Sequence, residues 1–196
     1  MHKSEAFTPS AVLTALARKQ QSDPECEVFG AQSHRYCLRP VIKEKPLVRL
    51  EKKHGLMLPH DYRTFLKRNG NGGAGPGHGI IPLQHAVGDM RIKNTPTTIA
   101  RYTSSSENLI PLCQHGCGDG AFIVIGGQYD GHVWEYDDLI GCYLPLIHEP
   151  EDLRDYFELP YEQYIKQIPA LIERYASHTM QSRVTFYQWY HQWLQA

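Results

Sequence analysis

The sequence has few cysteines and no long apolar run. Its 196 residues include 5 Cys. These residues are not closely paired, so we expect free thiols in a reducing compartment and no disulfide framework. No stretch approaches the ~18 apolar residues that a membrane-spanning helix needs, and the first residues show no apolar signal segment. The sequence therefore predicts a soluble, cytoplasmic protein with no membrane partner.

Basic residues are missing from one long segment. Residues 102–153 contain no Lys or Arg and 9 acidic residues, although the net charge of the whole chain is only -1. One interpretation is that this acidic segment neutralises the basic residues 1–101 within the fold. The other interpretation is an acidic recognition face, which would attract a basic partner and raise its association rate.

Sequence motifs for nucleotide binding are incomplete. Residues 70–75 fit the letters G-x-G-x-x-G, but they follow a predicted helix, whereas a dinucleotide site needs a preceding strand. Pro76 and Gly77 prevent an immediate helix from following, and the Gly-Lys-Ser/Thr ending of a phosphate-binding loop is absent. We expect no nucleotide cofactor here.

Motifs for metal binding and catalysis are also weak. Cys113, His115 and Cys117 form the one compact cluster of soft ligands, and they offer three ligands where structural zinc takes four. A Cys nucleophile with His115 or His132 is conceivable, but nothing in the sequence indicates a lowered thiol pKa. No G-x-S-x-G turn occurs. The sequence predicts a protein that is not an enzyme and has no catalytic, metal or cofactor site.

Hydrophobic periodicity and turn residues predict an α+β fold with helices at both ends of the chain. Helices are expected from a Ser10 cap to residue 20, from Pro46 to Gly55, from Pro59 to Asn69, and over residues 159–175 and 183–194. The glycine-rich residues 69–79 predict a long loop. Weak alternation suggests a hairpin over 27–31 and 35–38, and further strands are expected over 80–83, 109–113, 121–125, 132–136 and 142–146.

Two blocks of the sequence resemble the SUKH superfamily, of Smi/Knr type. The first block has a Glu-containing helix ending in Gly, then Leu-Pro, an aromatic pair and Asn-Gly, at Glu51, Gly55, Leu58, Pro59, Tyr62, Phe65, Asn69 and Gly70. The second block runs from Leu109 through Gly116 and Asp119 to the strand 121–125. The resemblance covers residues 41–175 of a single domain predicted over 1–196, with extensions at 1–40 and 176–196.

The resemblance implies a central antiparallel sheet flanked by helices, no cofactor, and function through a specific protein partner. Bacterial members of the superfamily are largely immunity proteins for polymorphic or contact-dependent toxins. The first hypothesis is therefore an immunity protein whose partner is a cognate toxin, with a basic nuclease domain as one candidate. The alternative is a regulatory scaffold like the related yeast cell-wall-synthesis regulator, with no toxin partner.

A third hypothesis is DNA binding by a helix-turn-helix. The two helices that begin at Pro46 and Pro59 would form it, and seven basic residues would contact phosphates: Lys43, Lys45, Lys52, Lys53, Arg63, Lys67 and Arg68. We rank it below the other two, so nucleic acid is not our expected partner.

The acidic segment supplies the predicted partner-binding residues. They are Asp119, Asp130, Glu135, Asp137 and Asp138. In a strand, Trp134 and Tyr136 share one face while Glu135 and Asp137 share the other. On a sheet with one covered face only one of these pairs is exposed, and we expect it to be the acids, which would mimic the charge of a nucleic acid towards a basic toxin.

Overall fold

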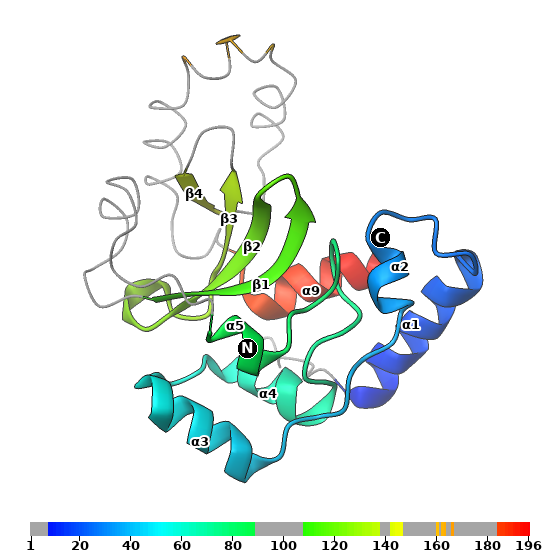
Figure 1. Ribbon diagram of the computed structural model, residues 1–196. Coiled ribbons are helices and arrows are strands. Elements are labelled where there is room, and N and C mark those ends of the chain that lie inside the picture. Colours follow the sequence, from blue (N-terminus) through cyan, green and yellow to red (C-terminus); the bar gives the residue numbers. More distant parts are fainter. Residues whose placement is uncertain are drawn as a thin grey trace, which may run out of the picture.

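The computed structural model has the predicted α+β architecture (Figure 1). It describes residues 8–88, 108–137, 142–146, 160, 162–163, 166 and 184–196. The helices and strands, in chain order, are α1 (Pro9–Ser22), α2 (Ala31–His34), α3 (Glu44–His54), α4 (His60–Arg68), α5 (Leu83–Ala86), β1 (Asn108–Gly116), β2 (Asp119–Ile125), β3 (Val133–Asp137), β4 (Cys142–Pro145) and α9 (Phe186–Gln195). None of the described helices is long and apolar enough to cross a membrane.

The sheet is an antiparallel meander in the order β1-β2-β3-β4. The four strands expected over 109–113, 121–125, 132–136 and 142–146 are confirmed. The outer edge of β1 is occupied by the end of the glycine-rich loop and the residues after it, because the N–H groups of His78 and Ile81 donate to the carbonyls of Gln114 and Leu112 at 2.9 and 2.7 Å. Covering an edge in this way removes a template for pairing with another chain.

Side chains of both faces of the sheet are buried. Ile123 and Val133 point into the main core, where they join residues of α1, α3, α4, α5 and α9. Their strand neighbours Phe122, Val124 and Trp134 form a second apolar cluster with Leu109, Tyr129 and Tyr143. The alternation follows from the two-residue period of a strand.

Helix α9 fills the centre of the main core with aromatic rings. The ring of Phe186 lies 4.9 Å from that of Tyr62 and 5.3 Å from that of Phe65, and Tyr190 lies 4.8 Å from Phe65. A capping box formed by Thr185 and Gln188 begins the helix. Figure 1 shows α9 below the sheet, with its last turn near α2.

The predicted helices in the first half are confirmed with shifted starts. Thr8 caps α1 in place of Ser10, because its side chain accepts from the N–H of Ala11, and Pro9 occupies the first turn. Helix α3 begins at Glu44 and ends at the left-handed Gly55 (φ 62). Helix α4 follows Pro59 and ends at Asn69. The last predicted helix is α9, whereas residues 159–175 lie almost entirely outside the described residues.

The hairpin predicted over residues 27–38 is wrong. The short helix α2 occupies its centre, and Asp23 organises the chain before it: the carboxylate of Asp23 accepts from the N–H groups of Glu27 and Val28 and from the hydroxyl of Tyr36. These side-chain hydrogen bonds replace the backbone pairing that a hairpin would have provided.

The strand predicted over 80–83 is also wrong. Ile80 makes only an isolated bridge to Gly73, and Pro82 then precedes the short helix α5. The side chain of Asn71 fixes this start, because its amide oxygen accepts from the N–H of Leu83 at 2.9 Å. A proline at a helix start costs no hydrogen bond, whereas it would remove one from a strand.

Candidate partner-binding site

The predicted acidic residues lie at two separate places on the sheet. Asp119 begins β2, and Glu135 and Asp137 lie in the second half of β3. The pairs Gly120–Tyr136 and Ala121–Glu135 are in register, so these three acids belong to the same end of neighbouring strands. Asp138 lies outside the described residues. The side chain of Glu135 is 44% exposed.

Asp130 lies at the opposite end of β2 and β3. It follows a single 3-10 turn, η1 (Gly127–Tyr129), and its carboxylate accepts from the N–H of Gly126 at 2.7 Å. The length of β2, at about 3.3 Å per residue, puts Asp130 roughly 20 Å from Asp119. Asp130 is exposed and closes the turn, and it does not form one patch with Asp119 and Glu135.

The expectation of exposed acids and covered aromatic residues on β3 can be checked only in part, because the side chain of Asp137 lies outside the described ones. The premise of one covered face is wrong, since both faces carry buried side chains, but the side chain of Glu135 is 44% exposed. Trp134 is fully buried in the second apolar cluster. Glu135, on the side of Val133, extends from the margin of the main core, where it meets His115 at a distance of 3.7 Å between Oε1 and Nε2. The candidate surface consequently consists of Asp119, Glu135 and the adjoining His115, at one end of the sheet.

Burial controls the chemistry of the Cys113–His115 pair. The sulfur of Cys113 lies 3.7 Å from Nε2 of His115. Burial is the main reason that the pKa of the Cys113 thiol is raised to about 12; a hydrogen bond with the backbone of Ala121 opposes this shift, and the nearby charge of Glu135 adds to it. Burial also lowers the pKa of His115, while Asp119 opposes this shift. The thiol stays protonated at neutral pH, so this pair lacks the thiolate that nucleophilic catalysis needs.

The described residues contain no group of three His, Cys, Asp or Glu side chains arranged to hold a metal ion. The third potential soft ligand, Cys117, is exposed at the β1–β2 turn, where it has a positive φ of 51. No residue of the described part therefore completes a zinc site around Cys113 and His115.

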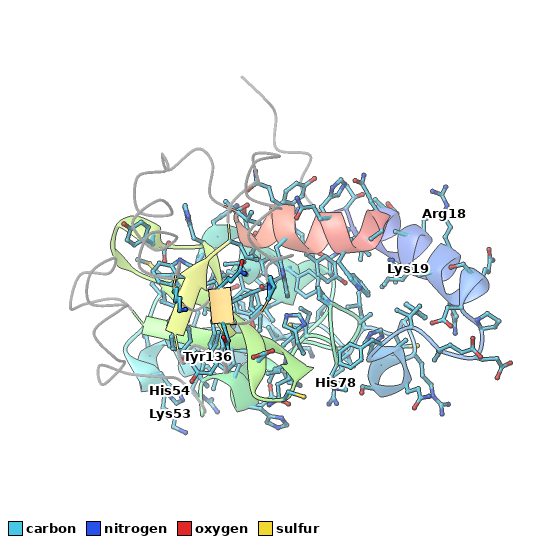
Figure 2. The ribbon with its side chains drawn as sticks, turned by 90° about the horizontal axis from the view of Figure 1, so that it is seen from above. Arg18, Lys19, Lys53, His54, His78 and Tyr136 are labelled. Atoms are coloured by element: carbon cyan, nitrogen blue, oxygen red, sulfur yellow. The ribbon has the colours of Figure 1, made fainter. Side chains whose placement is uncertain are left out.

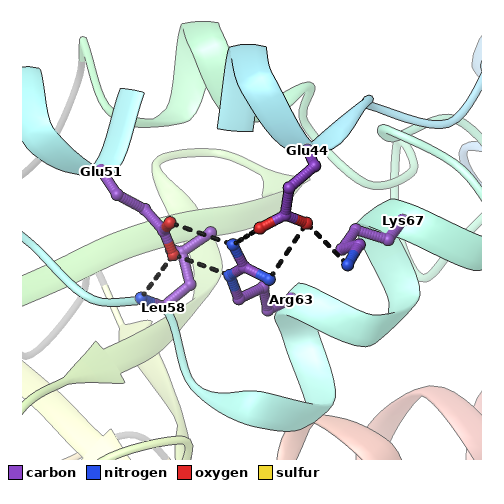
Figure 3. Close-up of polar contacts among 5 residues, drawn as sticks. All are labelled: Glu44, Glu51, Leu58, Arg63 and Lys67. Atoms are coloured by element: carbon purple, nitrogen blue, oxygen red, sulfur yellow. Dashed lines mark hydrogen bonds and ion pairs between the residues drawn. The ribbon is translucent and has the colours of Figure 1, made fainter. Parts of the chain in front are cut away.

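An ion-pair network links α3, α4 and the turn between them (Figure 3). Glu51 accepts from the N–H of Leu58 at 3.3 Å and from Nε of Arg63 at 3.0 Å. Glu44 bridges Arg63 and Lys67 at 2.6 Å each. Two of the seven basic residues considered for DNA binding are thus engaged with carboxylates of α3. The network joins the two helices and the turn between them, so its role is architectural.

Sequence reasoning missed two of these relationships. The pairing of Glu44 with Arg63 joins residues that lie 19 positions apart, and no local pattern indicates it. The proximity of His115 to Glu135 depends on the β1–β2–β3 register, in which Cys113 and Glu135 both lie opposite Ala121. This proximity could have been predicted only from a correct pairing of the three strands.

Comparison with known proteins gave one match. The model of the SMI1 / KNR4 family (SUKH-1) matches residues 42–167. No curated protein matches the chain, and no solved structure does.

Proposed function

Because the chain belongs to the SMI1/KNR4 family (SUKH-1), we propose that it is an immunity protein that binds a cognate polymorphic or contact-dependent toxin and neutralises it by protein–protein interaction. Family membership supports the proposal, since bacterial proteins of this superfamily are largely immunity proteins. The proposal places the protein in the cytoplasm, where it would meet the toxin, and assigns it no catalytic activity.

The observation that carries the proposal is the exposed carboxylate of Glu135 beside Asp119, within a segment without Lys or Arg. Toxins that attack nucleic acids bind phosphates and therefore tend to be basic. Opposite charges across an interface raise the association rate and determine orientation. The partner expected from this surface is a basic toxin domain, such as a nuclease.

The burial of Trp134 alters the expected chemistry of the interface. Aromatic residues are the usual anchors of protein interfaces, but Trp134 is fully covered and Tyr136 packs against the same cluster. We therefore assign the interaction to charge complementarity at Asp119 and Glu135.

The proposal is tested by capture and then by neutralisation. Tagged protein is incubated with lysate of its source, and the retained proteins are identified by mass spectrometry. The captured protein is then expressed, and its toxic activity is assayed with increasing amounts of this chain. The proposal expects one stoichiometric partner with a toxin domain, and loss of activity at a 1:1 ratio.

Two other outcomes contradict the proposal. Several substoichiometric partners without a toxin domain favour the regulatory scaffold. Full toxin activity in the presence of excess protein contradicts neutralisation directly. Two variants test whether the acidic surface itself binds the partner. Glu135→Lys with Asp119→Lys reverses the charge of the surface and should weaken binding. Glu25→Lys is the control for a change in net charge, since Glu25 is exposed elsewhere, in the segment between α1 and α2.

A further inference from the structure

A cavity of about 510 Å³ lies between α2, the glycine-rich loop and β1. The polar side chains that line it include Ser33, His34, Arg39, His78, His85 and Gln114. Volumes of this size are typical of small-ligand sites. Figure 2 shows His78 between the green β1–β2 hairpin and the blue α2.

The glycine-rich loop gives the cavity a firm wall. Gly73 and Ile80 exchange backbone hydrogen bonds of 2.9 and 2.7 Å, and the hydroxyl of Tyr190 donates to the carbonyl of Ala74 at 3.0 Å. Gly79 faces the cavity with a φ of +89, and a Cβ atom there would lie 2.4 Å from the carbonyl oxygen of Gly73. The loop therefore packs closely against its surroundings, and the cavity is part of the fold.

His34 belongs to the wall as a neutral ring. Its Nδ1 accepts from the N–H of Tyr36 at 3.0 Å, and the ring also makes a hydrogen bond with the backbone of Gly75. The ring of Trp193 lies 5.9 Å away, in an edge-on arrangement. Burial lowers the pKa of His34, which keeps the imidazole uncharged. His34 thus holds α2 against the glycine-rich loop and contributes no positive charge.

Each of the remaining polar side chains of the cavity can donate a hydrogen bond, and Arg39 can only donate. Arg39 contributes a guanidinium group that carries a permanent positive charge, and His78 and His85 are exposed imidazoles. Nδ1 of His78 lies 3.1 Å from the hydroxyl of Ser33, which orients the ring. Among the described residues that line the cavity there is no Asp or Glu.

We propose that this cavity is a binding site for an oxyanion, a carboxylate or a phosphate group, held by Arg39, His78 and His85. Guanidinium groups bind carboxylate and phosphate oxygens with paired hydrogen bonds, and imidazole N–H groups add further donors. No carboxylate among the described lining residues would repel such a ligand. The site uses other residues than the acidic surface, and the proposal does not depend on the proposed function.

The oxyanion can come from a free small molecule or from an acidic side chain of a protein. Two probes distinguish these sources: inorganic phosphate, and a short capped peptide with one Glu, which is compared with the same peptide carrying Gln. Each probe is titrated at constant ionic strength into the full chain. The ring signals of His78 and His85 are followed by NMR.

The proposal expects saturable shifts of both rings with phosphate or with the Glu peptide. Binding of phosphate alone identifies a free anion as the ligand, and binding of the Glu peptide alone identifies a protein carboxylate. Arg39→Gln is expected to weaken binding at least about tenfold, because a charge-assisted contact is lost. Arg39 is exposed, so this variant should fold, which an unchanged melting temperature verifies.

The matched control is Arg18→Gln. Arg18 is an exposed residue of α1 that does not line the cavity (Figure 2), and its replacement removes the same charge. Binding should be unchanged in this variant. Equal weakening in Arg18→Gln and Arg39→Gln, or no saturable shift with either probe, would overturn the proposal.

Discussion

The hydroxyl of Tyr190 donates to the carbonyl of Ala74 at 3.0 Å, and so joins α9 to the glycine-rich loop across 116 positions of the chain. Both residues are fully buried. The bond gives the loop a fixed point in the main core, which explains how a segment with so many glycines forms one wall of a cavity.

Replacement of Tyr190 by Phe should lower the free energy of unfolding by about 1–3 kcal/mol, because the buried carbonyl of Ala74 loses this donor. Urea denaturation measures the change. Tyr62→Phe is the matched control: the hydroxyl of Tyr62 is buried and has no hydrogen-bond partner among the described residues, so this variant should lose no stability. Equal losses in the two variants would show that the Tyr190 bond contributes nothing specific.

Gly79→Ala should be much more destabilising than Gly55→Ala. Both glycines have a positive φ, of +89 and +62, so both substitutions incur a backbone cost of about 1–2 kcal/mol. A Cβ atom at Gly79 would also overlap the carbonyl of Gly73, whereas at Gly55 nothing lies within 4 Å. We expect Gly79→Ala to lose about 1–3 kcal/mol beyond the loss in Gly55→Ala in thermal unfolding. Similar losses would argue against the close packing of the loop.

Glu44 should contribute to stability only above acidic pH. Hydrogen bonds from Arg63 and then Lys67 lower the pKa of its carboxyl from 4.5 to about 2. Because the pKa is lower in the folded state, the contribution is present above pH 4.5 and is lost as the pH falls towards about 2. Urea unfolding across this range should show a flatter acid dependence for Glu44→Gln than for the wild type.

The effect at Glu44 should also weaken in high salt, because its side chain is 50% exposed. Glu25→Gln serves as the control, as Glu25 is exposed outside the helices. An acid dependence of Glu44→Gln that matches the wild type would contradict a role for the pairing of Glu44 with Arg63 and Lys67.

Cys113 should resist alkylation while Cys117 reacts. Burial raises the pKa of the Cys113 thiol to about 12, whereas Cys117 is exposed. At mildly alkaline pH, we expect iodoacetamide to modify Cys113 at least about 100-fold more slowly than Cys117, as the thiolate is the reactive species. Peptide mass spectrometry follows both sites. In urea the two rates should converge, and fast modification of Cys113 in the folded protein would refute its burial.

Reversal of the acidic surface should weaken binding of the proposed partner. Asp119→Lys combined with Glu135→Lys is expected to cost about 2 kcal/mol or more, as for charges within an interface. Calorimetry with the captured partner gives the affinity, and Glu25→Lys is compared as the control. An unchanged affinity would remove this surface from the interface.

The sequence predicted those elements whose signals are local. Pro59 before α4 and Gly55 after α3 mark positions where backbone geometry allows few alternatives, and α3 and α4 are confirmed there. The four strands of the sheet were also found, since apolar segments between glycine-bearing turns have few other conformations. The helix α2 was missed because its surroundings depend on hydrogen bonds of Asp23 to Glu27, Val28 and Tyr36.

The candidate site was predicted only in part, because the positions of the acidic residues in the sequence do not show how the strands that carry them pair. Asp119 and Glu135 are brought to one end of the sheet by the β2–β3 register, while Asp130 is carried to the other end. The cavity was not predicted, although its glycine-rich wall was noted. Its polar residues come from α2 and the segment after it, the glycine-rich loop, α5 and β1, and no sequence spacing relates those segments.

The position of α9 in the core has a consequence for synthesis on the ribosome. The rings of Phe186 and Tyr190 contact Tyr62 and Phe65, which are translated much earlier. The nascent chain therefore exposes the apolar surface of α4 until α9 has left the exit tunnel, and exposed surfaces of this kind favour aggregation. The main core therefore cannot be completed before α9 has left the exit tunnel.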